Sequence, residues 1–183
     1  MKLVVLFGPA AVGKMTVGMS LAELTGFKLL HNNMALDLIA RFFPRGSPGF
    51  SLYPEINSRI IEEAARSGAP DIIFTVVWAL DSADDWALME QRRESVERHG
   101  HAVYWVELCA SQQERVRRNA TPLRVREKPR QSAELTPEVM RMLDATYKLN
   151  SSDDFPLRPY LRLDVESMSP ADAAEQIRTT FEL

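Results

Sequence analysis

Two glycines and a lysine near the N-terminus stand at a spacing that suits phosphate binding. Gly8 and Gly13 enclose four residues and Lys14 follows at once, which gives the pattern G-x-x-x-x-G-K. Glycines allow turns that side chains would forbid, so successive backbone N–H groups can surround an anion. The lysine supplies a cation for the outer phosphates of a nucleotide. We expect a nucleoside triphosphate, in the first instance ATP, to contact the whole loop: Gly8, Pro9, Ala10, Ala11, Val12, Gly13, Lys14, Met15 and Thr16.

The segments on either side of this loop support the interpretation. Residues 3–7 are apolar throughout, which is typical of a strand buried on both faces. Val17, Leu21 and Leu24 then recur at helical spacing, and the N-terminus of that helix would add partial positive charge to the loop. The alternative is an ordinary strand, turn and helix with a surface lysine.

Magnesium usually accompanies a bound triphosphate, and it prefers oxygen ligands. Met15 stands directly after the lysine, where a metal-binding hydroxyl is common, and a thioether binds a hard cation poorly. Thr16 is therefore one candidate ligand. Asp81 is the other, because it follows the apolar run 72–78 and the carboxyl ends of parallel strands face the ligand crevice. The alternative is Mg²⁺ held mainly by phosphates and water.

Strand-like and helical patterns alternate along the remaining chain. The apolar runs are residues 3–7, 27–30, 72–78, 102–108 and 160–163. Five strands alternating with helices predict an α/β fold, an open parallel sheet with helices on both faces. The 183 residues suit a single domain. Residues 119–135 are polar and basic and contain two prolines, so we expect a loop there.

Composition narrows the classes of partner. The net charge of −3 gives no bulk positive field, which makes nucleic acid an unlikely partner. No stretch approaches the roughly 20 apolar residues that a membrane-spanning helix needs. The single cysteine, Cys109, excludes an internal disulfide and fits a cytoplasmic protein. A monomer and a homodimer are both compatible with the sequence.

The phosphate loop, the order of strands and helices, and the basic segment together resemble the small P-loop kinases of the shikimate kinase, adenylate kinase and chloramphenicol phosphotransferase group. The Met15-Thr16 pair resembles adenylate kinase, in which glycine and then threonine follow the lysine. The resemblance implies a P-loop NTPase three-layer sandwich with strand order 2-3-1-4-5. It also implies a lid at about residues 119–135 and ATP-dependent, Mg²⁺-assisted phosphoryl transfer to a small hydroxyl-bearing molecule.

The same resemblance assigns roles to basic residues. Lid arginines close over the triphosphate in these kinases, and Arg118 and Arg124 are the matching candidates, with Lys14 as the third catalytic cation. Such residues fit phosphoryl transfer, in which positioning and electrostatics do most of the work. Arg59 matches an arginine that binds the acceptor phosphate in nucleoside monophosphate kinases. The alternative for each arginine is a solvated surface residue.

The acceptor side is less well defined. Shikimate kinase carries an aspartate pair near the end of its second strand, whereas this chain has His31-Asn32-Asn33 there. His31 and Asp37, one helical turn beyond Asn33, are the candidate general bases, and a structural histidine is the alternative. Asn33 and Arg59 are the candidate acceptor-binding residues.

Three functions remain open at this point. The first is an ATP-dependent kinase for a small hydroxyl compound, which the acidic balance and the lid-like segment favour. The second is a protein that binds or slowly hydrolyses a nucleotide without small-molecule kinase activity, since no acidic pair follows the second strand. The third is a kinase for nucleic-acid ends.

Overall fold

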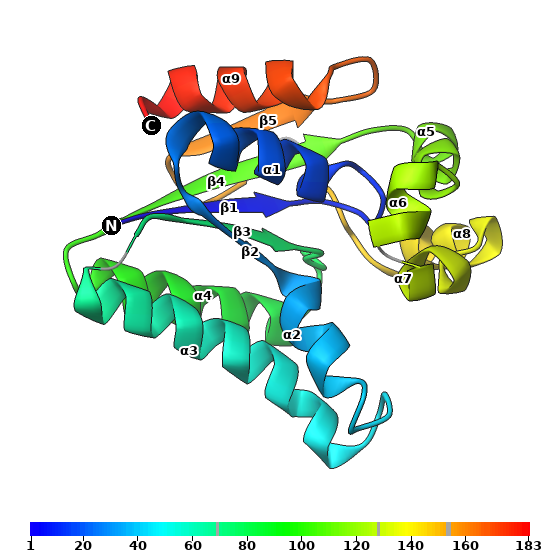
Figure 1. The fold of residues 1–183 in the computed structure, drawn as a ribbon, viewed down its shortest axis with the longest axis horizontal. Coiled ribbons are helices and arrows are strands. Elements are labelled where there is room, and N and C mark those ends of the chain that lie inside the picture. The colour runs from blue at the N-terminus through cyan, green and yellow to red at the C-terminus, as the bar shows by residue number, and fades with distance from the viewer. Residues whose placement is uncertain (69, 128, 153–154) are drawn as a thin grey trace.

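Five parallel strands form one sheet in the order β2-β3-β1-β4-β5, in a computed structural model that describes residues 1–68, 70–127, 129–152 and 155–183 (Figure 1). Every neighbouring pair is parallel. This topology confirms the fold predicted from the sequence. The strands are β1 (Lys2–Phe7), β2 (Lys28–His31), β3 (Ile72–Val76), β4 (Ala102–Cys109) and β5 (Tyr160–Asp164).

Helices cover both faces of the sheet. One face carries α1 (Lys14–Thr25) and α9 (Pro170–Phe181), and the other carries α3 (Leu52–Ser67) and α4 (Ala83–Glu97) (Figure 1). The remaining helices lie toward the carboxyl edge of the sheet: α2 (Asn32–Ile39), α5 (Gln112–Asn119), α6 (Pro122–Glu127), α7 (Pro129–Glu134) and α8 (Pro137–Thr146). No helix in the described ranges is long and apolar enough to cross a membrane.

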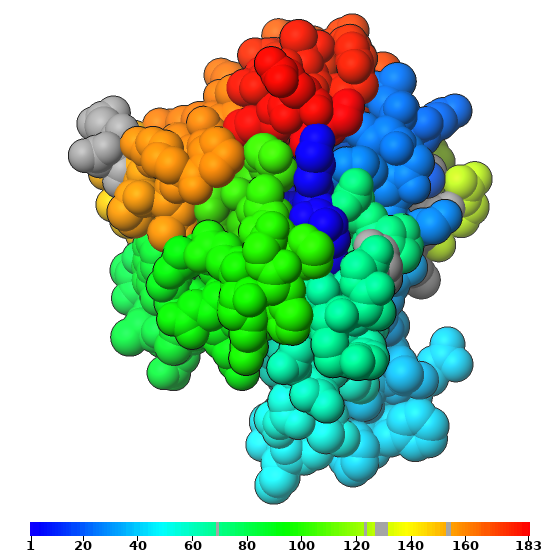
Figure 2. Space-filling model, turned by 90° about the vertical axis from the view of Figure 1, so that its left-hand side faces the viewer, coloured from blue at the N-terminus to red at the C-terminus, as the bar shows by residue number. Residues whose placement is uncertain are grey.

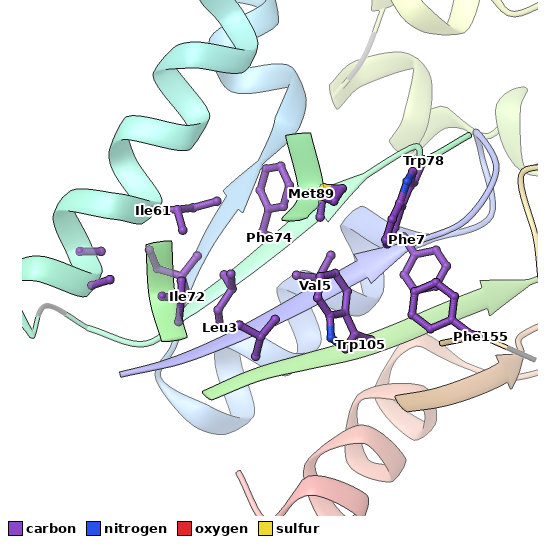
Figure 3. Close-up of a cluster of buried hydrophobic side chains, with 14 residues drawn as sticks. Leu3, Val5, Phe7, Ile61, Ile72, Phe74, Trp78, Met89, Trp105 and Phe155 are labelled. Atoms are coloured by element: carbon purple, nitrogen blue, oxygen red, sulfur yellow. The ribbon is translucent and has the colours of Figure 1, made fainter. Parts of the chain in front are cut away.

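The core divides into two clusters because side chains alternate along each strand. Leu3, Val5 and Phe7 of β1 point to the α3/α4 face, where they pack with Trp78, Trp105 and Phe155 among others (Figure 3). Val4 and Leu6 point to the α1/α9 face. A strand covered on both faces must be apolar at every position, which explains the uninterrupted run that begins the chain.

The segment that joins α2 to α3 projects from the body of the molecule (Figure 2, cyan). It includes a short 3₁₀ helix, Pro48–Ser51. This projection matters for function because Arg45 within it, and Tyr53 at the start of α3, line the cavity described below.

The prediction of a loop at residues 119–135 is wrong. The segment contains α6 and α7, each of which begins at a proline. Proline suits the first position of a helix, where its missing N–H would have no intrahelical partner. The two prolines that suggested a loop therefore mark two helix starts. Within this segment, Lys128 lies outside the described residues.

Candidate functional site

The phosphate loop connects β1 to α1 and has the backbone geometry that its glycines allow. The φ angles of Gly8 and Gly13 are +132° and +114°. A Cβ atom on Gly8 would lie 2.3 Å from the carbonyl oxygen of Leu108 on β4. Ala11 also has a positive φ, of +62°, which is uncommon for a residue with a side chain. The loop is thus held in a specific conformation against the neighbouring strand.

The helix that follows this loop offers an anion site. Gly13 is the N-cap of α1, and no side chain caps the helix by a hydrogen bond. The first N–H groups of a helix lack intrahelical partners and attract negative charge. Nζ of Lys14 donates to the carbonyl oxygens of Gly8 and Pro9, at 2.7 Å each, so the ammonium group lies over the loop. Thr16 Oγ1 donates to Gly13 O at 2.9 Å.

A cavity of about 570 Å³ lies over the phosphate loop. That volume falls within the range of small-molecule sites. It is lined by the loop, by the carboxyl ends of β2 and β3, by residues of the α5–α8 region, and by Arg45 and Tyr53. The cavity therefore extends from the phosphate loop to the carboxyl ends of β2 and β3 and to Tyr53 on α3.

Two of the predicted acceptor-side residues, His31 and Asn33, line this cavity. His31 is also the N-cap of α2, because its Nδ1 accepts a hydrogen bond of 3.0 Å from the backbone N–H of Asn33. In a neutral ring this acceptor role places the proton on Nε2. His31 in this arrangement is a hydrogen-bond donor toward other groups rather than a ready base.

Three predicted residues lie away from the cavity. Asp37 is exposed on α2. The side chain of Arg59 is 79% exposed and pairs with Glu62 at 2.8 Å. Asp81 accepts a hydrogen bond of 2.9 Å from the backbone N–H of Lys148. None of these three lines the cavity, so their predicted site roles have no support from the geometry.

The two predicted lid arginines differ in their surroundings. Arg124 lines the cavity, its Nε donates to Asn119 Oδ1 at 2.6 Å, and burial lowers the pKa of its guanidinium. Arg118 is held by the backbone: its Nη1 donates to Val12 O at 2.7 Å and its Nη2 to Val165 O at 2.5 Å. Arg118 thus connects α5 to the phosphate loop and to the loop after β5.

A smaller cleft of about 250 Å³ lies on the other side of Arg118. The cleft combines apolar side chains with two guanidinium groups, and it adjoins the phosphate loop. These features suit a flat aromatic base attached to a phosphate chain. Its residues are Val12, Gly13, Thr16, Val17, Arg117, Arg118, Val165, Met168 and Pro170.

Thr75 is a cavity residue that was not predicted from the sequence. It lies on β3, is 1% exposed and lines the main cavity. Its Oγ1 has no hydrogen-bond partner among the residues that the structure describes. A buried hydroxyl without a partner is costly, and a ligand or ordered water would satisfy it. The only sequence signal was a polar residue inside the apolar run 72–78.

Glu107 anchors the loop before β5 to the sheet. It is completely buried on β4, and its carboxylate accepts hydrogen bonds from Asn150 Nδ2, Ser151 N, Ser151 Oγ and Tyr160 OH at 2.6–2.8 Å. Burial alone would raise the pKa of Glu107, but these hydrogen bonds outweigh it and lower the pKa. Burial and the bond to Glu107 raise the pKa of Tyr160 to about 12.

Comparisons with known proteins agree with this fold. No protein-family model and no curated protein sequence matches the chain. Among solved structures, a putative kinase from Chloroflexus aurantiacus is 15% identical with a TM-score of 0.71, covering 99% of this chain and 96% of its own. Shikimate kinase from Acinetobacter baumannii is 18% identical with a TM-score of 0.59, covering 99% and 93%.

APS kinase from Mycobacterium tuberculosis is 17% identical with a TM-score of 0.62, and the match covers 100% of this chain and 98% of that one. Identities this low establish the fold alone. The chain has the fold of the small P-loop kinases, as the resemblance implied, and its strand order is the one expected for them. That fold carries a cavity over the phosphate loop.

Proposed function

We propose that this protein is an ATP-dependent phosphotransferase that acts on a small hydroxyl-bearing molecule. The cavity over the phosphate loop is the observation that carries the proposal. It provides room for a phosphate chain at the loop and for a second reactant toward His31, Asn33 and Tyr53. A protein that only bound a nucleotide would not need the part of the cavity that lies beyond the phosphate loop.

The nucleotide would lie across both clefts. Its triphosphate would accept hydrogen bonds from the loop and the N-terminus of α1, and Lys14 would turn from the carbonyls of Gly8 and Pro9 to the outer phosphates. The base would enter the cleft between Arg117 and Met168. Arg118 would fix the position of one cleft relative to the other, because it already donates to the carbonyl oxygens of Val12 and Val165.

Positioning would account for most of the catalysis. Phosphoryl transfer passes through a loose transition state that depends on electrostatic stabilisation more than on a strong base. Arg124 would neutralise charge on the transferring group, since it lines the same cavity as the phosphate loop. His31, through Nε2–H, and Asn33 would orient the acceptor hydroxyl.

Magnesium would bind with the nucleotide rather than to a protein carboxylate. Thr16 and Thr75 offer hydroxyl groups at the cavity, and the unpartnered Oγ1 of Thr75 suits a metal-bound water. The described residues contain no group of three or more histidines, cysteines or acids that could hold a metal ion by themselves. When bound, the ion would neutralise phosphate charge.

We place the protein in the cytoplasm, where ATP and a reduced Cys109 are both expected.

Replacement of Lys14 tests the proposal. We expect Lys14→Ala to weaken ATP binding by about 10- to 100-fold, the usual effect of losing a hydrogen bond to a charged group, and to abolish transfer. Calorimetry would measure affinity, and γ-labelled ATP with a panel of small hydroxyl compounds would measure transfer. Lys2→Ala is the matched control, since its Nζ donates to Glu182 O at the opposite edge of the sheet. Unchanged ATP affinity in Lys14→Ala would refute the nucleotide site.

A further inference from the structure

A small annex extends from the acceptor end of the main cavity. Its volume is about 60 Å³, and it lies between α3, α4 and the end of β3. Asn32, Tyr53, Val76 and Val77 line both the annex and the main cavity, so the two spaces adjoin. The annex has room for roughly four water molecules, or for one compact polar group of a ligand.

A buried arginine forms part of the annex wall. Arg92 on α4 is 2% exposed, and its guanidinium carbon lies 4.9 Å from the ring centre of Phe74. Its nitrogens donate to Ser58 Oγ at 3.0 Å, Pro54 O at 3.2 Å and Met89 Sδ at 3.4 Å. Across the described residues, no carboxylate lies within ion-pair distance of Arg92. The buried cation therefore has only neutral hydrogen-bond partners.

Trp78 and Asp85 also line the annex. Trp78 is completely buried, and its Nε1–H has no hydrogen-bond partner in the described part of the chain. Asp85 also lines the annex, and its Oδ2 accepts a hydrogen bond of 2.9 Å from Ala79 N. Burial lowers the pKa of Arg92 to about 10, against the opposing effects of Tyr53 and Asp85, so Arg92 remains a cation at neutral pH.

We propose that the annex is a subsite for a carboxylate group of the acceptor, which makes the acceptor a small hydroxy acid. This inference rests on the proposed kinase function. A buried charge with no carboxylate at ion-pair distance is costly, and Asp85 acts on Arg92 only from farther away. A ligand carboxylate would accept hydrogen bonds from both Arg92 and Trp78. Asp85 faces the same space and repels a doubly charged group, so a carboxylate fits better than a phosphate. The hydroxyl then lies toward the phosphate loop.

The indole N–H of Trp78 provides a direct test that does not depend on turnover. Its resonance in ¹H–¹⁵N spectra can be assigned from its loss in Trp78→Phe. Glycolate, gluconate and shikimate are the probes, each with a neutral counterpart, ethylene glycol, glucose and shikimate methyl ester. We expect at least one acid to move this resonance saturably, with no effect from its neutral counterpart. If no acid shifts the Trp78 signal, the subsite does not exist.

Arg92→Met should weaken that binding by about 10- to 100-fold and leave ATP affinity unchanged. Arg93→Met is the matched control, because the next residue on α4 pairs with Glu90 and Glu97 on the helix surface. Should Arg92→Met fail to fold, Arg92→Lys and Trp78→Phe test the same contacts. Equal binding of acids and neutral compounds by the wild type would overturn the inference.

Kinetics with γ-labelled ATP separates the subsite from the kinase proposal. We expect the bound acid to be phosphorylated, and Arg92→Met to raise its KM with little change in kcat. Binding of the acid at Trp78 without any transfer would refute the kinase and keep the subsite. Transfer to neutral compounds alone, unaffected by Arg92→Met, would refute the subsite and keep the kinase.

Discussion

Gly8 combines a φ of +132° with a close approach to β4, since an added Cβ would meet the Leu108 carbonyl oxygen at 2.3 Å. We expect Gly8→Ala to lower the free energy of unfolding by about 2–5 kcal/mol, through backbone strain plus the steric clash. Gly100→Ala is the control, because Gly100 also has a positive φ but no atoms near its Cβ position. Urea unfolding of both variants measures the difference, and equal losses would show that the clash is unimportant.

Glu107 shows how a buried charge can hold a loop. We expect Glu107→Gln to lower the free energy of unfolding by about 2–4 kcal/mol at pH 7, because the amide cannot accept all the hydrogen bonds from Asn150, Ser151 and Tyr160. The pKa of Glu107 is lowered in the folded state, so its stabilisation is present above its ordinary value of 4.5. That stabilisation is lost as the pH falls through the folded-state pKa.

Urea unfolding of Glu107→Gln and the wild type over a series of pH values tests this assignment. The difference should narrow as the pH falls below about 4.5, because the unfolded chain then takes up a proton at Glu107 before the folded protein does. Glu175→Gln is the surface control, because Glu175 pairs with Arg178 in solvent and such pairs contribute little. A difference between Glu107→Gln and wild type that did not depend on pH would contradict an ionised Glu107.

At the scale of secondary-structure elements, Asn119 connects the end of α5 to the two helices that follow. Its Nδ2 donates to Ser132 O at 3.0 Å and Leu135 O at 2.9 Å, and its Oδ1 accepts from Arg124. We expect Asn119→Ala to increase hydrogen exchange in α6 and α7 and to slow phosphoryl transfer, because Arg124 loses its position. Hydrogen-exchange mass spectrometry measures the first effect and the labelled-ATP assay the second.

Asn119→Asp separates the two contacts of this side chain. The carboxylate still accepts from Arg124 but cannot donate to Ser132 O or Leu135 O. We expect fast exchange in α6 and α7 as in the alanine variant, with transfer closer to wild type. If both variants exchanged as slowly as the wild type, Asn119 would not hold this segment.

The strands and helices were largely predictable from the sequence. Which side of each helix is buried was not. Apolar runs identified the strands, because a strand buried on both faces is apolar throughout. The order of the strands in the sheet came from the resemblance to the small P-loop kinases, and it is confirmed. The orientation of two helices explains why Asp37 and Arg59 do not line the cavity. On α2 the buried residues are Ala35, Leu36 and Ile39, which leaves Asp37 on the opposite side. Arg59 is likewise outward on α3, where Asn57 and Ile61 are buried.

Strand ends raise the same difficulty. The apolar run 72–78 continues beyond β3, which ends at Val76, so Asp81 lies in a turn rather than at the strand terminus. Thr75 of β3 lines the cavity, whereas Asp81, which was expected there, does not. His31, by contrast, is the last residue of β2, and Asn33 follows it two positions later. Both line the cavity, as expected.

For the whole molecule, the fold places all the proposed chemistry at the carboxyl edge of one sheet, as open α/β sheets generally do. Both chain termini lie at the opposite edge (Figure 1). The phosphate loop, the ends of β2 and β3, and the α5–α8 region meet over one cavity. A ligand that fills this cavity contacts segments distant in sequence, so its binding should stabilise the entire fold.

Stabilisation by ligand therefore tests the site and its metal together. ATP with Mg²⁺ at about 100 times its Kd should add about 2.7 kcal/mol to the free energy of unfolding, which thermal unfolding would detect as a higher Tm. Mg²⁺ alone should have no such effect, because the described residues include no acidic or histidine cluster to bind it. EDTA should reduce the effect of ATP, since Thr16 and Thr75 would bind magnesium only together with phosphates. A rise in Tm with Mg²⁺ alone would instead indicate a protein metal site.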